Sequence, residues 1–237
     1  MNRLALMLLK NIHKVPGAFS KLWHYAKHTD EYPEMEKYSH IQYIMRLAVK
    51  AGNVNLKVTG QENIPQENGF IMYGNHQGMF DVMAIVADMH HPMSAVFKTE
   101  LKDIPLIREI AACLKGLPMD RDDVRQSLEV IRTVTKEIQA GRNYIIYPEG
   151  TRSKNGNVMG EFHHGSFRCA TAAKCPVLPV CVIDTHKVLD RKGSKPITVQ
   201  MHYLKPIMPE EYKGMKTNQL ADLVKSRIQE WLDEYAK

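Results

Sequence analysis

Cysteine and long apolar runs are both scarce in this sequence. The four cysteines lack the CxxC spacing of a zinc ribbon, and without a secretion signal they do not indicate a disulfide framework. A reducing compartment fits this usage. The longest apolar run near the start, Leu4 to Leu9, is far shorter than the roughly 20 residues that span a bilayer. We therefore expect no conventional membrane span.

Acidic residues are also missing from the start of the chain, because none precedes Asp30. The net charge is +6, from 32 basic and 26 acidic residues, which favours anionic partners. Nearly all of this excess positive charge comes from basic residues that precede the first acidic residue: Arg3, Lys10, Lys14, Lys21 and Lys27. We expect this end to meet a negative partner such as a membrane surface. The basic residues after Asp30 are dispersed, so no nucleic-acid partner is predicted.

The first 28 residues predict two short amphipathic helices, at 2–14 and 18–28, broken at Pro16-Gly17. Lysines flank an apolar stripe that includes Phe19 and Trp23, a pattern that suits a helix lying in the membrane interface. Two alternatives stay open. The helices could pack on their own domain, or form a mitochondrial transit peptide, although the segment is poor in arginine and serine.

After a predicted helix at 34–51, short β-rich runs alternate with helical stretches. The predicted strands are 54–59, 69–74, 94–98, 143–147, 177–182 and 197–203. The predicted helices that follow are 79–90, 122–140, 165–174 and 217–235. This alternation indicates an α/β fold, with a mixed sheet flanked by helices and an N-terminal helical membrane-binding appendage. We predict that the appendage is residues 1–51 and the α/β domain residues 52–237.

A first polar motif, Asn75-His76-Gln77-Gly78-Met79-Phe80-Asp81, follows an apolar run that predicts a buried strand. Loops that follow strands commonly carry function. Residues five apart point about 140° away from each other on a helix, so Asp81 reaches His76 only if Gln77-Gly78 forms a turn. The carboxylate would then fix one ring nitrogen and leave the other to take a proton from a substrate hydroxyl.

The same motif has a structural alternative, in which His76 is a packing residue and Asp81 caps the helix that follows it. A metal site is not predicted, because one histidine and one aspartate do not complete a ligand set and no HExxH motif accompanies them.

A second motif, Tyr147-Pro148-Glu149-Gly150-Thr151-Arg152-Ser153, follows the strand-like run 143–147. Pro148 ends the strand and Gly150 permits a tight backbone path. Arg152 and nearby backbone amides suit a phosphate group, and Glu149 would hold the arginine or a sugar-like hydroxyl. The alternative is a solvated turn with an incidental Glu149–Arg152 pair.

Together, Asn75-His76 with Asp81 and the later run Tyr147 to Arg152 resemble the paired signatures of the glycerolipid acyltransferase family, typified by 1-acylglycerol-3-phosphate acyltransferase. Three more stretches are similar to that family: Phe97-Lys98-Thr99-Glu100-Leu101 with Ile104-Pro105, Met119-Asp120-Arg121, and Cys175-Pro176-Val177-Leu178-Pro179-Val180. The resemblance covers roughly residues 55 to 205.

The resemblance implies a role for each matched position. His76 would be the general base, Asp81 its orienting partner, and Glu149, Gly150, Thr151 and Arg152 the acceptor-phosphate loop, with Lys98 and Arg121 adding positive charge. One stretch departs from the family, which commonly has a lysine where this sequence reads Phe162-His163-His164-Gly165. The phosphate pocket would be less positive as a result.

The implied reaction moves a fatty acyl chain from acyl-CoA or acyl carrier protein to the sn-2 hydroxyl of 1-acylglycerol 3-phosphate, giving phosphatidate. The sequence has no GxSxG nucleophile motif, so we expect direct attack without a cofactor, with amides near Gly78 stabilising the oxyanion. The alternatives are an acyltransferase for glycerol 3-phosphate or another lysolipid acceptor, a hydrolase, or a non-catalytic membrane-binding protein. The expected location is the cytoplasmic face of a membrane, peripheral or monotopic.

Overall fold

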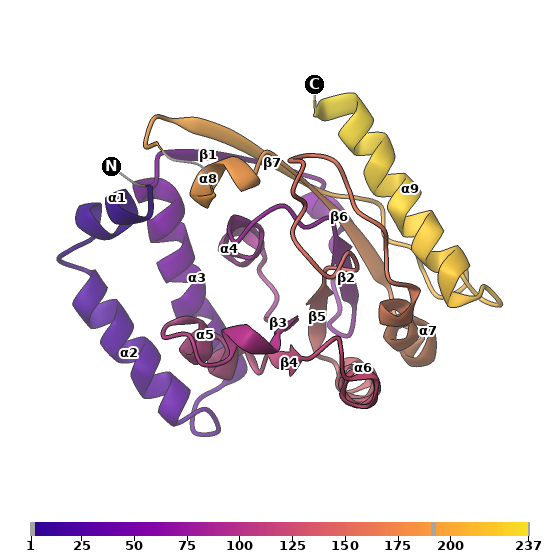
Figure 1. The fold of residues 1–237 in the computed structure, drawn as a ribbon. Helices are drawn as coiled ribbons and strands as arrows, with labels where there is room; N and C mark the ends of the chain where they lie inside the picture. The colour runs from indigo at the N-terminus through magenta and orange to yellow at the C-terminus, as the bar shows by residue number, and fades with distance from the viewer. Residues whose placement is uncertain (1–2, 191–192, 237) are drawn as a thin grey trace.

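A computed structural model describes residues 3–190 and 193–236, and their strands form one seven-stranded sheet in the order β1-β7-β6-β2-β5-β3-β4 (Figure 1). The strands are β1 (Val54–Thr59), β2 (Ile71–Gly74), β3 (Met93–Lys98), β4 (Leu117–Met119), β5 (Asn143–Ile146), β6 (Val177–Ile183) and β7 (Ile197–Tyr203). Every neighbouring pair is parallel except β6 and β7, which are antiparallel. The predicted mixed α/β sheet is confirmed.

The central strands of the sheet are buried on both faces, and nearly all their side chains are apolar. All residues of β2, β5 and β6 are buried, as parallel strands covered by helices on both faces require. Tyr73 of β2 pairs in register with Ile146 of β5, and Gly74 of β2 pairs with Val180 of β6. The loops after these strands therefore open on the same edge of the sheet, where ligands bind in α/β folds.

Helices cover both faces of this sheet (Figure 1). One core cluster joins the sheet to α3 (Glu34–Ala51), α4 (Phe80–Asp88) and α5 (Ile107–Leu114). The other joins it to α6 (Val124–Gln139), α7 (Arg168–Ala173) and α9 (Thr217–Tyr235). The buried residues of α9 recur at helical spacing and form one stripe: Leu220, Ala221, Val224, Ile228 and Leu232. Truncating such a leucine to alanine costs about 2–5 kcal/mol of folding free energy.

The N-terminal helices pack against the same core. Leu22 and Tyr25 of α2 (Val15–Lys27) are fully buried in the first cluster, together with residues of the sheet. Arg3 of α1 (Arg3–Lys10) is buried as well, and its guanidinium donates to the carbonyls of Val188, Gly52 and Lys195. Arg3 therefore does not add to the exposed basic surface. The division of the chain after residue 51 stays a prediction.

The helix boundary predicted at Pro16-Gly17 is wrong. The break lies at residues 11–14, and Pro16 sits in the first turn of α2. Proline is tolerated there because the first-turn amides have no partner within the helix. Two α-helices and one strand were also not predicted, namely α5, α8 (His186–Leu189) and β4. Within the described chain, no helix is long and apolar enough to cross a bilayer.

Candidate active site

His76 follows the carboxyl end of β2 and contacts Asp81, the second residue of α4. The His76 Nδ1 lies 2.7 Å from the Asp81 Oδ2, and the Asp81 side chain is fully buried. The turn that brings them together runs from Gly78 to Asp81, whose amide donates to the Gly78 carbonyl at 3.3 Å, and α4 begins within it at Phe80. A buried carboxylate at Nδ1 favours the tautomer that carries its proton there, so Nε2 is the nitrogen left to accept a proton. The histidine side chain is 19% exposed, which gives it access to a substrate.

Asp81 also organises the backbone of the turn. Its Oδ2 accepts hydrogen bonds from the amides of Gln77 at 2.7 Å and Gly78 at 3.0 Å. The sequence left two alternatives for Asp81, a partner of His76 or a cap of the helix that follows. The carboxylate does both, because it contacts the imidazole and accepts from amides that precede α4. These two amides point at Asp81, so the expectation that amides near Gly78 stabilise an oxyanion is wrong for both.

Two buried amide side chains anchor the histidine loop to the strand beside it, a role that the sequence did not suggest. Asn75 exchanges two hydrogen bonds with the backbone of Val182 in β6, at 2.9 and 2.8 Å. The Gln77 Nε2 donates to the same carbonyl, while its Oε1 accepts from the backbone amide and hydroxyl of Thr185 and contacts the His186 ring. Nothing local marks this function, which depends on β6 lying next to β2.

The second motif lies next to His76 because β5 pairs with β2. The Tyr147 ring stacks on the imidazole, with centroids 4.1 Å apart. The Glu149 Oε1 accepts from the His76 amide at 2.7 Å, and the Ser153 amide donates to the His76 carbonyl at 2.7 Å. The loop therefore holds the backbone of His76 on both sides, and the two motifs form one structural unit.

Glu149 serves a structural purpose that differs from the predicted one. Its second oxygen accepts from the Gly160 amide at 2.7 Å, and the side chain is buried. Burial raises the pKa of Glu149, and the two backbone amides oppose this rise by favouring the carboxylate. Both oxygens are thus engaged by backbone. The expectation that Glu149 holds Arg152 is wrong, because Arg152 pairs with Asp190 instead.

Gly150 has a φ of 72°, a left-handed conformation that favours glycine. A Cβ at this position would lie 3.0 Å from the His163 ring and 3.5 Å from the Arg121 guanidinium. Arg121 therefore approaches the second motif at Gly150, and so does His163, which lies in the stretch that departs from the family pattern. Lys98 pairs with Glu100, and the charges of Lys98 and Arg121 both help to lower the pKa of Glu100, after the hydrogen bond from Lys98.

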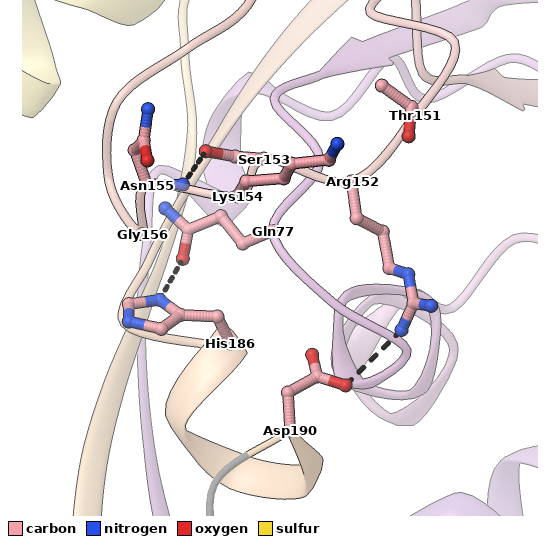
Figure 2. Close-up of a pocket in the computed structure, with 9 residues that line it drawn as sticks. All are labelled: Gln77, Thr151, Arg152, Ser153, Lys154, Asn155, Gly156, His186 and Asp190. Atoms are coloured by element: carbon pink, nitrogen blue, oxygen red, sulfur yellow. Dashed lines mark hydrogen bonds and ion pairs between the residues drawn. The ribbon is translucent and has the colours of Figure 1, made fainter.

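Arg152 turns the other way, toward the end of α8. Its Nη1 lies 3.2 Å from the Asp190 Oδ1, and the two side chains are 48% and 40% exposed. Both line a pocket of about 600 Å³ (Figure 2), together with Gln77, Thr151, Ser153, Lys154, Asn155, Gly156 and His186. A second pocket, of about 310 Å³, lies across the same loop and includes Glu149, Met159 and His163. The site roles predicted from the sequence stay predictions, but the structure places all these residues around one edge of the sheet.

A family model described as Acyltransferase matches residues 55–183, more than half of the chain and the whole of both motifs. The chain belongs to the acyltransferase family. The match spans β1 to β6 and therefore includes the strands that position His76, Asp81 and Arg152.

Curated relatives of this acyltransferase carry one activity in their names. The chloroplastic 1-acyl-sn-glycerol-3-phosphate acyltransferase BAT2 of Brassica napus is 27% identical over 73% of this chain and 49% of its own length. The 1-acyl-sn-glycerol-3-phosphate acyltransferase of Salmonella typhimurium is 29% identical over 77% of this chain and 75% of its own length. The chain thus spans about half the length of the chloroplastic relatives it matches.

The same fold occurs in a solved structure. The crystal structure of the 1-acyl-sn-glycerophosphate acyltransferase PlsC from Thermotoga maritima has a TM-score of 0.78 to this chain and is 21% identical to it. The superposition covers 98% of this chain and 97% of the other, so it includes the N-terminal helices as well as the sheet.

Proposed function

We propose that this acyltransferase moves a fatty acyl chain from an acyl thioester to the sn-2 hydroxyl of 1-acylglycerol 3-phosphate. The observation that carries the proposal is the 2.7 Å contact between His76 and Asp81, held against a loop that bears Arg152. The names of the relatives support the choice of acceptor. The donor would be acyl-CoA or acyl carrier protein, both of which present a thioester.

His76 would act as the general base. Its Nε2 takes the proton of the acceptor hydroxyl as that oxygen attacks the thioester carbon, while Asp81 stabilises the imidazolium that forms. A carbon–oxygen bond forms, the carbon–sulfur bond breaks, and the departing thiolate takes the proton back from the imidazolium. Such base catalysis contributes about 10²- to 10⁴-fold in rate. Tyr147 keeps the ring plane in place by stacking on it.

Arg152 would bind the acceptor phosphate. The loop that bears Arg152 is joined to the His76 backbone, so the bound phosphate would be held at a fixed position relative to the base. Two hydrogen bonds connect the loop to that backbone, through Glu149 and Ser153. The planar guanidinium suits a phosphate because it offers two parallel donors. Thr151 lines the same pocket, and Arg121 and Lys98 supply positive charge on the side of Gly150.

The first helices would hold the enzyme on the cytoplasmic face of a membrane as a peripheral or monotopic protein. Exposed apolar side chains gather there: Leu4, Leu8, Leu9, Ile12 and Trp23 are between 43% and 65% exposed. Lysines 14, 21 and 27 are interspersed among them. Figure 1 shows α1 and α2 at the side of the molecule opposite α9. Apolar side chains next to cations suit an anionic lipid interface.

The reaction is tested by following thiol release from acyl-CoA and from acyl carrier protein, with and without 1-acylglycerol 3-phosphate. We expect release that depends on the acceptor and is lost in His76→Ala. His40→Ala is a matched control, because that ring contacts the Ala18 carbonyl in the N-terminal helices. Release without the acceptor would make the protein a thioesterase, and an unchanged rate in His76→Ala would remove the base from the mechanism.

A further inference from the structure

An acidic side chain, Asp190, occupies the place beside Arg152 where an anionic ligand would bind. The two side chains meet in the pocket of about 600 Å³ that contains the phosphate loop (Figure 2). Asp190 also lies over the histidine turn, since a Cβ built on Gly78 would come within 2.6 Å of its Oδ2. A bulkier residue at position 78 would collide with this carboxylate.

The position of Asp190 is set by the same network that holds His76. It follows α8, whose first turn is attached to the histidine loop through Gln77. The Gln77 Oε1 accepts from the Thr185 amide and hydroxyl at 3.1 Å each and lies 3.3 Å from the His186 Nδ1. Asp190 is therefore placed at the site by tertiary contacts.

The geometry points to Asp190 as a built-in counter-ion of the acceptor site, which holds Arg152 until the phosphate of the acceptor displaces it. This inference rests on the function proposed above. The carboxylate and the phosphate compete for the same guanidinium donors. A phosphate monoester carries about −1.5 to −2 charge at neutral pH, whereas a carboxylate carries −1. The bound phosphate therefore displaces the carboxylate from Arg152.

The strength of the pair suits such an exchange. Both side chains are nearly half exposed, and ion pairs of this kind are weak because water and salt screen them. The pair therefore occupies the guanidinium donors of Arg152 but is weak enough to yield to a ligand. Asp190 would then set the affinity for the acceptor without taking part in the chemistry.

The test compares Asp190→Asn with the unchanged enzyme, and uses Glu211→Gln as the matched control. Glu211 also pairs with an arginine, Arg227, but that partner lies on α9, on the other side of the sheet (Figure 1). The acceptor KM is measured for 1-acylglycerol 3-phosphate in micelles, along with the inhibition constant of inorganic phosphate. We expect Asp190→Asn to lower both by about two- to fivefold, the range set by weak exposed ion pairs, with Glu211→Gln unchanged.

A double-mutant cycle separates competition from a general charge effect. In an Arg152→Ala background, Asp190→Asn should lose most of its effect, because no guanidinium remains to be released. A rise in KM on Asp190→Asn would overturn the inference, since it would mean that Asp190 orients Arg152 for the phosphate. An effect that persists undiminished without Arg152 would overturn it as well.

If the proposed function is wrong, the protein without substitutions will show no turnover that depends on the acceptor. In that case the binding of inorganic phosphate, measured by calorimetric titration on both proteins, tests Asp190 without any reaction. Tighter binding to Asp190→Asn supports the counter-ion role, and equal or weaker binding refutes it.

Discussion

Asp81→Asn isolates the contribution of the buried charge, because asparagine has nearly the same shape as aspartate. The Oδ2 of Asp81 contacts three donors, the His76 Nδ1 and the amides of Gln77 and Gly78. The amide oxygen of asparagine can replace it in all three contacts. The turn should therefore keep its geometry, while the negative charge beside the imidazole is lost.

The size of the effect follows from the charge that develops on His76 during the reaction. Two unit charges about 4 Å apart interact by about 4 kcal/mol at the effective dielectric of protein sites, and a transition state that carries part of the charge loses part of that energy. A loss of about 2–4 kcal/mol lowers kcat by about 30- to 1,000-fold. The free energy of unfolding should change little, because the three hydrogen bonds are kept while the cost of burying a full charge is removed.

The assay is thiol release at saturating donor and acceptor, with circular dichroism and urea unfolding to check the fold. Asp88→Asn is the matched control, since Asp88 ends the same helix and its Oδ1 accepts from the side-chain Nε2 of Gln61, a bond that asparagine can keep. We expect Asp88→Asn to keep its kcat. If Asp81→Asn keeps kcat within about threefold with its fold intact, the carboxylate only organises the turn and the general-base reasoning fails.

Three further outcomes are expected. Arg152→Ala should raise the acceptor KM by about 10- to 100-fold with a smaller change in kcat, because a charge-assisted hydrogen bond contributes about 1.5–3 kcal/mol to binding. A loss of kcat with an unchanged KM would contradict a role of Arg152 in phosphate binding. Burial lowers the pKa of His202 in the folded protein, so the neutral ring favours the folded state. This contribution to stability is fully present above about pH 6.5 and is lost as the pH falls through the lowered pKa of the folded state. In urea titrations, His202→Asn should accordingly lose less stability on acidification than the unchanged protein. An equal loss would show that protonation of His202 does not cause the loss. Leu9→Asp with Ile12→Asp should weaken flotation with anionic vesicles, whereas Val124→Asp, at a still more exposed site on α6, should not.

Point substitutions are preferable to deletion of residues 1–28 for the membrane test. Leu22 and Tyr25 are fully buried in the core cluster that α2 shares with α3 and α5, so a truncated chain would expose its core. Exposed apolar residues would then promote nonspecific binding to vesicles, and the result would not report on the first helices.

Local sequence pattern predicted the long elements well where one pattern extended over many residues. The predicted bounds agree with the structure for β1, β7, α3 and α9. Gly52 stops α3, and the apolar stripe of α9 repeats over 19 residues. The short elements α5, β4 and α8 were missed, because a few residues carry too little periodicity to separate a helix from a loop.

The chemistry of the site was readable from the sequence in part. The order of residues in both motifs, with an apolar strand before each, indicated that His76 and Arg152 lie at one sheet edge, and the resemblance named their roles. The contacts of Glu149 could not be read in this way. The His76 amide is brought to it only when β5 pairs with β2, and the Gly160 amide only when the loop after Glu149 folds back.

Local pattern and residue order were enough to indicate the α/β class, the family and the candidate site residues. Tertiary structure alone decided which groups face one another. Asp190 follows β6 and Arg152 follows β5, and the two meet because β5 and β6 both lie beside β2 in the sheet. An ion pair between distant segments depends on strand order, and strand order is set by the packing of the whole domain.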